Sequence, residues 1–139
     1  MKLRLTKKFD FEMAHALTLY DGKCRNIHGH SYKLYVTVEG ECLDGESGMV
    51  MDFHMLKDIV EKQILQHFDH ALVLPKLQQA DAPYFVGYDA KLILTSFQPT
   101  TENLLIHFAG LIADKIPSPA KLYSLKLYET ESSCAELIL

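Results

Sequence analysis

Hydrophobic and polar residues alternate along two stretches near the start of the chain, from Leu3 to Met13 and from Ser31 to Glu39. Because successive side chains of a β-strand point to opposite faces of its sheet, this period of two predicts two half-buried strands. Residues 20–23 between them have the turn-forming sequence Tyr-Asp-Gly-Lys. We therefore expect two neighbouring strands that form a hairpin-like pair.

Two later stretches carry apolar residues at the spacing of an α-helix. Asp52 precedes the first and Thr100 precedes the second, and both residue types are good N-caps. Glu102 lies in the first turn of the second helix, where a negative charge is favourable against the helix dipole. The apolar positions are Leu56, Ile59, Val60, Ile64 and Phe68 in the first helix and Leu104, Leu105, Phe108, Leu111, Ile112 and Ile116 in the second.

The end of the chain predicts two closing strands, Lys121 to Glu129 and Cys134 to Leu139, with a polar turn between them. Residues 91–97 fit either a strand or an extended arm, and residues 75–89 are less regular. The order β-β-α-α-β-β is typical of an α+β fold. We predict one domain over residues 1–139, with an antiparallel four-stranded sheet and two helices on one of its faces.

Composition narrows the classes of function. The 139 residues have a formal net charge of −4 and contain no basic run, which argues against a nucleic-acid partner. No apolar stretch is long enough to cross a membrane, and the N-terminus lacks the apolar core of a signal peptide. Three cysteines, an odd number, suggest free thiols in a reducing compartment. We therefore expect a cytoplasmic protein.

Three histidines and one cysteine gather around the connection between the first two strands. His28 and His30 flank Gly29, so on a strand both imidazoles leave the same face. His15 ends the preceding strand, where antiparallel pairing would bring it close to them. Three neutral imidazoles bind Zn²⁺ well and leave a fourth position open, which is the pattern of a catalytic zinc site. Cys24 is near enough in sequence to lie beside the metal.

These residues also have ordinary structural interpretations. A His-x-His pair alone is weak evidence, and the third histidine is what favours a metal site. Cys24 could be a small buried apolar residue, but its neighbours Lys23 and Arg25 favour a thiolate. Those two basic residues are only a weak indication of phosphate binding. The other histidines and cysteines lack a partner pattern and are expected to be structural: His54, His67, His107, Cys42 and Cys134.

The local sequence does not decide the roles of two acidic residues, Asp69 and Glu129. Asp69-His70 at the end of the first helix fits a carboxylate–imidazole relay and a helix-end cap equally well. Glu129 lies at the end of a strand, and its immediate neighbours favour a solvated position.

Six short motifs follow one another over nearly the whole chain. They are Phe11-x-x-x-His15, Cys24-x-x-x-His28-Gly29-His30, Gly48-Met49-Val50-Met51-Asp52-Phe53, Asp69-His70, Pro99-Thr100-Thr101-Glu102-Asn103 and Glu129-Thr130. One of them alone would be weak, but six in this order resemble the 6-pyruvoyl-tetrahydropterin synthase family. That family includes a bacterial branch, the 6-carboxy-tetrahydropterin synthases of queuosine and 7-deazaguanine biosynthesis.

The resemblance implies the tunnelling fold, whose subunits join their sheets into a barrel and stack as a homohexamer, a dimer of trimers. It also implies a catalytic set assembled at a subunit interface, and it replaces the solvated interpretation of Glu129 by a pterin-binding one. The implied roles are zinc binding for His15, His28 and His30, catalysis for Cys24, Asp69 and His70, and pterin binding for Glu129, Thr100 and Thr101.

The implied substrate is 7,8-dihydroneopterin triphosphate. A carboxylate can accept both N3–H and the 2-amino group of its pterin ring. Zinc, as a Lewis acid, would acidify a carbon-bound hydrogen next to the oxygens that it holds, and a Cys24 thiolate would remove that proton. His70, oriented by Asp69, would move protons on the ring side. The pyruvoyl branch ends with internal redox and elimination of triphosphate, whereas the carboxy branch also releases acetaldehyde.

No motif separates these two products, and a compact sequence without an N-terminal extension favours the carboxy enzyme. The cysteine at position 24 argues against the branch of the family that has an acid there. Residues 75–97 form a longer segment than in the shortest bacterial members, and no role is assigned to it. Two other classes of function stay open: a hydrolase that uses zinc-bound water, and a non-catalytic pterin- or metal-binding module.

Overall fold

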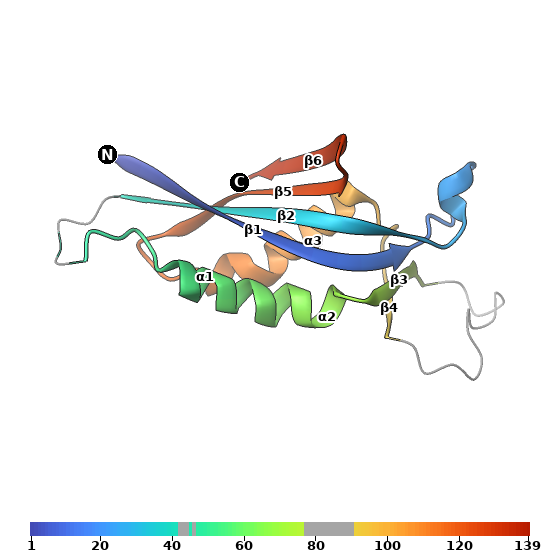
Figure 1. Ribbon diagram of the computed structural model, residues 1–139, viewed down its shortest axis with the longest axis horizontal. Coiled ribbons are helices and arrows are strands. Elements are labelled where there is room, and N and C mark those ends of the chain that lie inside the picture. The colour runs from blue at the N-terminus through green and yellow to red at the C-terminus, as the bar shows by residue number, and fades with distance from the viewer. Residues whose placement is uncertain (42–44, 46, 77–90) are drawn as a thin grey trace.

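The computed structural model describes residues 1–41, 45, 47–76 and 91–139. Its strands form one sheet, and Figure 1 shows the helical run from α1 to α2 along one side of that sheet. The strands are β1 (Lys2–His15), β2 (His28–Glu41), β3 (Ala71–Pro75), β4 (Leu92–Thr95), β5 (Lys121–Thr130) and β6 (Ser133–Ile138). Their order across the sheet is β4-β3-β1-β2-β5-β6.

The first two strands form the hairpin that the alternating pattern predicts. They pair antiparallel over their full length, from Lys2 opposite Glu41 to His15 opposite His28. From Phe9 onward the odd-numbered residues of β1 point to the buried face, as do the even-numbered residues of β2. One face of the hairpin is therefore apolar along most of its length.

The predicted four-stranded antiparallel sheet is wrong in two respects. The sheet has six strands, and it is mixed, because β3 pairs in parallel with both β1 and β4. The order of the long elements is thus β-β-α-β-β-α-β-β rather than β-β-α-α-β-β. The strand alternative for residues 91–97 is confirmed by β4, whereas most of the irregular segment, residues 77–89, lies outside the described residues.

Two helical runs cover the sheet. The first comprises α1 (Phe53–Val60), the π-helical η2 (Glu61–Leu65) and α2 (Gln66–Phe68). The second comprises α3 (Thr101–Ile112) and the 3₁₀ turn η4 (Ala113–Lys115), and a separate 3₁₀ turn, η1 (Lys23–Arg25), lies between β1 and β2.

Both predicted N-caps are confirmed. The Asp52 carboxylate accepts a hydrogen bond from the backbone N–H of His54 at 2.7 Å. The Thr100 hydroxyl accepts one from the backbone N–H of Asn103 at 3.2 Å. A cap of this kind stabilises a helix by about 1 kcal/mol.

The apolar core lies between the helices and one face of the sheet. Its fully covered members include Leu34, Val36, Leu125 and Leu127 from the sheet and Val60, Ile64, Leu104, Phe108 and Ile112 from the helices. No helix among the described residues is long and apolar enough to span a membrane. At the end of the hairpin opposite the N-terminus, histidines take the place of apolar residues on this same face.

Candidate functional site

The three predicted histidines meet at the end of the β1–β2 hairpin. His15 faces His28 directly across the ladder, and His30 faces Met13 one step further along. The ring centroids are 4.7 Å apart for His15 and His28, 4.9 Å for His28 and His30, and 5.2 Å for His15 and His30. The pairing of two regular strands therefore brings together imidazoles that are up to 15 residues apart in sequence.

Backbone carbonyls fix two of the imidazole rings. Nδ1 of His15 lies 2.7 Å from the carbonyl oxygen of Pro99, and Nδ1 of His28 lies 2.7 Å from that of Asn26. A carbonyl oxygen only accepts, so each Nδ1 carries the hydrogen and each neutral ring presents the lone pair of its Nε2. This is how second-layer groups orient imidazoles toward a metal.

The remaining nitrogens turn toward a common point. Nε2 of His28 and Nε2 of His30 are buried and have no hydrogen-bond partner. A buried nitrogen without a partner is unfavourable unless an ion or a water satisfies it. Burial also lowers the pKa of His30 below its ordinary value, so the ring stays neutral, as a metal ligand must be.

Glu129 completes the cluster from β5. Its Oε1 lies 3.1 Å from Nε2 of His30 and 3.2 Å from Nε2 of His15. One ligand atom from each of the three histidines and from Glu129 falls in a group whose members all lie within 4.8 Å of one another. The contact with His15 holds the pKa of Glu129 below its ordinary value, against the effect of burial. The carboxylate is therefore ionised.

Tyr32 closes the inner side of the cluster. Its hydroxyl lies 3.4 Å from Nε2 of His15, and its ring packs against the rings of His15 and His30. Burial raises the pKa of Tyr32, so the hydroxyl stays protonated. This residue continues the alternation of His28 and His30 on β2, so the period of two in the sequence could have placed it here.

The donor set fits a divalent metal. Neutral imidazoles together with a carboxylate are a common ligand set for zinc. Two unsatisfied buried nitrogens and two rings oriented through Nδ1 are what such a site requires. Three imidazoles and one carboxylate of this protein could therefore hold one metal ion.

Cys24 lies in η1, in the loop that joins the two strands of the hairpin. It is a free, half-buried thiol, and its backbone carbonyl accepts a hydrogen bond from Leu17 at 2.9 Å. Its sulfur is not a member of the histidine–carboxylate cluster. The loop thus places the thiol beside the strand end, outside the group of ligand atoms.

Asp69 and His70 lie on the other side of β1, where α2 passes into β3. The Asp69 carboxylate accepts a hydrogen bond from the backbone N–H of Glu12 at 2.9 Å and lies 3.0 Å from Nδ1 of His70. His70 has a positive φ of 62° and donates its own backbone N–H to the Glu12 carbonyl at 2.6 Å. A positive φ in a histidine is uncommon, and here two hydrogen bonds to the backbone of Glu12 in β1, one from the His70 N–H and one to the Asp69 carboxylate, maintain it.

A lysine that sequence reasoning did not single out holds the same turn. The ammonium of Lys91 donates to the carbonyl oxygens of Gln66 and Asp69, at 2.9 and 2.7 Å. A positive charge at the C-terminal end of a helix is favourable, and here it also fixes the backbone that presents His70. The side chain of His70 is 77% exposed.

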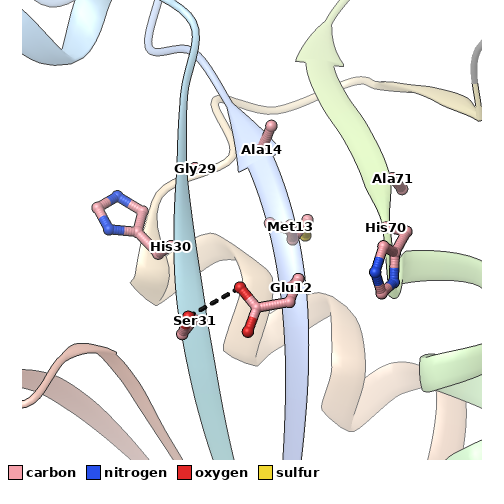
Figure 2. A pocket seen from close by; sticks show the side chains of 8 residues that line it. All are labelled: Glu12, Met13, Ala14, Gly29, His30, Ser31, His70 and Ala71. Atoms are coloured by element: carbon pink, nitrogen blue, oxygen red, sulfur yellow. Dashed lines mark hydrogen bonds between the residues drawn. The ribbon is translucent and has the colours of Figure 1, made fainter.

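Within one chain, His70 does not join the metal cluster. Figure 2 shows its ring beside β1, at the start of β3, and the ring of His30 beyond β2, so that both hairpin strands separate the two rings. His70 borders a cavity of about 340 Å³ that His30 also lines, together with Glu12 and Ser31, whose side chains hydrogen-bond at 2.8 Å. The two halves of the predicted site thus lie on opposite sides of the hairpin strands, and His30 and His70 border the same cavity.

The segment before α3 reaches the cluster through its backbone. Pro99 supplies the carbonyl that orients His15, and Thr100 and Thr101 follow it directly. The Thr100 hydroxyl is engaged as the helix cap. Sequence reasoning placed both threonines near the site but missed the Pro99 and Asn26 carbonyls, because backbone groups leave no trace in residue type.

The histidines and cysteines expected to be structural fit that interpretation where they are described. His54 and His67 are exposed on the first helical run, and the ring of His107 packs against those of Phe68 and Phe97. Cys134 is exposed on β6. Cys42 lies outside the described residues.

Comparison with known proteins points to one family. The family model described as "6-pyruvoyl tetrahydropterin synthase" matches residues 4–138. The chain is 34% identical over 140 residues to the Haemophilus influenzae protein named "6-carboxy-5,6,7,8-tetrahydropterin synthase", covering 96% of each protein. It is 37% identical over 114 residues to the Homo sapiens "6-pyruvoyl tetrahydrobiopterin synthase", covering 81% of this chain and 68% of that protein.

A solved structure shares the fold. The "6-pyruvoyl tetrahydropterin synthase" of Caenorhabditis elegans superimposes with a TM-score of 0.73 and 25% sequence identity, over 100% of this chain and 96% of that one.

Proposed function

This chain belongs to the 6-pyruvoyl tetrahydropterin synthase family, and we propose that it is a zinc-dependent 6-carboxy-5,6,7,8-tetrahydropterin synthase. The proposed reaction converts 7,8-dihydroneopterin triphosphate and one water molecule to 6-carboxytetrahydropterin, acetaldehyde and triphosphate, as a step toward queuosine. The cytoplasm is the proposed location, because a reducing compartment keeps the thiol of Cys24 free.

One observation carries the proposal. Nε2 of His28 and Nε2 of His30 are buried without a partner, beside His15 and an ionised carboxylate. His15, His28 and His30 are the proposed zinc ligands. When bound there, the metal would act as a Lewis acid that increases the acidity of a carbon-bound hydrogen in the substrate.

Glu129, Thr100 and Thr101 are the proposed pterin-binding residues. A pterin presents N3–H and its 2-amino group side by side, and a carboxylate is the group that accepts both at once. The ionised state of Glu129 supports this role. Thr100 and Thr101 follow the residue whose carbonyl orients His15, which keeps them close to the cluster.

Cys24 is the proposed base that removes the proton from the substrate side chain. Cys24 is a free, half-buried thiol that lies between two basic residues, Lys23 and Arg25. His70, oriented by Asp69 through a 3.0 Å contact, is the proposed group that moves protons on the ring side. Triphosphate then leaves from the substrate.

We propose that these groups meet between subunits of a homohexamer. His70 is strongly exposed and lies on the other side of the hairpin strands from the imidazoles of its own chain, which supports a site to which a second copy supplies its His70. Both sheet edges carry exposed apolar residues, Leu92 and Leu94 on β4 and Ile138 on β6. Exposed apolar edge strands favour pairing with another subunit, as closure into a barrel requires.

The pyruvoyl synthase is the second candidate. The Pongo abelii protein named "6-pyruvoyl tetrahydrobiopterin synthase" is 38% identical to this chain, but over only 81% of its length. The carboxy synthase of Haemophilus influenzae matches over 96% of each protein, which is why we favour the carboxy reaction.

Product analysis tests the proposal and separates the two reactions. Purified protein is incubated with 7,8-dihydroneopterin triphosphate, and the pterin product and acetaldehyde are identified by mass spectrometry. The carboxy reaction yields 6-carboxytetrahydropterin and acetaldehyde in equal amounts. A pyruvoyl product without acetaldehyde would establish the second candidate, and binding of zinc and pterin without turnover would establish a binding module.

A further inference from the structure

Glu129 occupies a place in the cluster that pterin binding alone does not explain. A carboxylate that waits for a pterin should point into the substrate space. Its Oε1 lies instead 3.1 and 3.2 Å from the Nε2 atoms of His30 and His15.

These contacts indicate a shared cation. When the ring of His15 is neutral, its hydrogen lies on Nδ1 against the Pro99 carbonyl, and its Nε2 carries a lone pair. A lone pair facing a carboxylate oxygen is repulsive unless a positive charge lies between them. The same holds for Nε2 of His30, which has no hydrogen-bond partner although Oε1 of Glu129 is 3.1 Å away.

The backbone at Glu129 differs from that of the three histidines. His15, His28 and His30 all lie in regular pairs of the β1–β2 ladder. The β5–β6 register pairs Tyr128 with Cys134 and Thr130 with Ser133, and it passes over Glu129. Bulges of this kind redirect a side chain and occur next to active sites. The cluster therefore combines three imidazoles in a regular ladder with one carboxylate on an irregular backbone.

We infer that Glu129 is a displaceable fourth metal ligand, which leaves the cluster to bind the pterin when substrate arrives. This inference rests on the proposed function and extends it. A carboxylate oxygen bound to a metal is a weaker hydrogen-bond acceptor, so pairing both oxygens with N3–H and the 2-amino group favours release of the metal by Glu129. Pterin binding thus frees a coordination position at the moment when the rest of the substrate needs it. Without substrate, Glu129 keeps that position closed.

Cobalt(II) provides a test that does not depend on turnover. Metal-free protein is loaded with Co²⁺, its affinity is measured by competition with a chelator, and its visible absorption spectrum reports the ligands. Glu129→Gln removes the charge with little change of shape, and Glu131→Gln makes the same change at an exposed position two residues away. We expect Glu129→Gln to weaken Co²⁺ binding at least about tenfold and to alter the spectrum, whereas Glu131→Gln behaves as wild type.

Addition of neopterin, which lacks the triphosphate, tests the displacement itself. In the wild type it should shift the Co²⁺ spectrum toward that of metal-loaded Glu129→Gln, and in Glu129→Gln it should change little. Glu129→Asp, which keeps the charge but is shorter by one methylene group, should fall between the two in affinity. Circular dichroism shows whether each variant is folded. If Glu129→Gln does not fold, the Glu129→Asp affinity and the neopterin shift in the wild type decide the outcome.

The results separate this inference from the proposed function. If Glu129→Gln or Glu129→Asp binds Co²⁺ with the wild-type affinity and spectrum, Glu129 is not a fourth ligand. This conclusion would hold even if the protein converts dihydroneopterin triphosphate. A wild-type spectrum insensitive to neopterin would overturn the displacement. Weakened metal binding in a protein without turnover would instead support the ligand and refute the enzyme.

Discussion

Nδ1 of His15 lies 2.7 Å from the carbonyl oxygen of Pro99, a residue 84 positions later in the sequence. This contact joins the end of β1 to the segment that opens α3. It fixes the tautomer of a ring that is only 1% exposed and turns its Nε2 toward two other imidazoles. A ligand held in this way is already oriented before a metal arrives.

His28→Ala should remove the metal without unfolding the protein. His28 is only half-buried at the end of the hairpin, and the apolar core lies elsewhere on the sheet. We expect metal affinity to fall by at least about tenfold, as measured by elemental analysis and chelator competition, with an unchanged circular dichroism spectrum. His54→Ala, an exposed histidine on α1, is the matched control and should keep its metal. Unfolding of His28→Ala would indicate a structural metal.

Cys24→Ala should abolish most of the activity and leave the metal in place. Loss of a general base typically costs about 10²–10⁴-fold in rate. The measurement is kcat with 7,8-dihydroneopterin triphosphate, together with metal content. Cys134→Ala removes an exposed thiol on β6 and should have nearly wild-type activity. Full activity in Cys24→Ala would favour a hydrolase in which metal-bound water is the nucleophile.

Two inactive variants should restore activity when they share an oligomer. If Cys24 of one subunit works with His70 of another, co-expression of Cys24→Ala with His70→Ala assembles some sites that carry both wild-type residues. We expect each variant alone to be inactive and the mixed oligomer to recover part of the wild-type kcat.

The control for this experiment is a mixture of Asp69→Asn with His70→Ala. Asp69 and His70 are neighbours on one subunit, 3.0 Å apart, so every site receives one damaged copy of the pair. This mixture should stay inactive. Recovery in neither mixture, in oligomers shown to contain both variants, would mean that each site is built from a single subunit.

Glu39→Gln should destabilise the protein at neutral pH but not in acid. Glu39 bonds Arg4 at 3.0 Å and lies 3.3 Å from the ammonium of Lys2, and these contacts hold its pKa below the ordinary value. A carboxylate with a lowered folded-state pKa stabilises the protein above its unfolded-state pKa, and that contribution is lost as the pH falls through the folded-state value.

Urea unfolding at a series of pH values measures this effect. The difference in unfolding free energy between wild type and Glu39→Gln should be largest at neutral pH and should shrink in acid. Glu131→Gln, exposed in a turn, should show no such dependence. A difference that stays constant with pH would assign the effect of Glu39 to packing rather than to charge.

The sequence predicted the parts of the site that depend on strand periodicity. Alternation through Phe11 and Met13 indicated a strand that His15 ends, and the spacing of His28 and His30 indicated that their imidazoles leave one face of the next strand. Antiparallel pairing of neighbouring strands then brings the three rings together, as the ladder confirms. The N-caps Asp52 and Thr100 could also be predicted from the sequence, because a cap depends only on residues within the same turn.

The sequence did not predict features that depend on long-range register. β3 has five residues, is apolar throughout and pairs in parallel with β1, so neither alternation nor a tight turn marks it. Glu129 appears locally as a solvated strand end, and only the bulge between β5 and β6 accounts for its irregular place in the sheet. Lys91 reaches carbonyls more than 20 residues away, which local residue type does not indicate.

An anomalous difference map at the zinc absorption edge, from a crystal of the purified protein, tests the central claim most directly. We expect one peak in each subunit, about 2.0–2.1 Å from Nε2 of His15, His28 and His30. No peak at this position in zinc-loaded protein, or a metal ion bound only elsewhere on the molecule, would contradict the account.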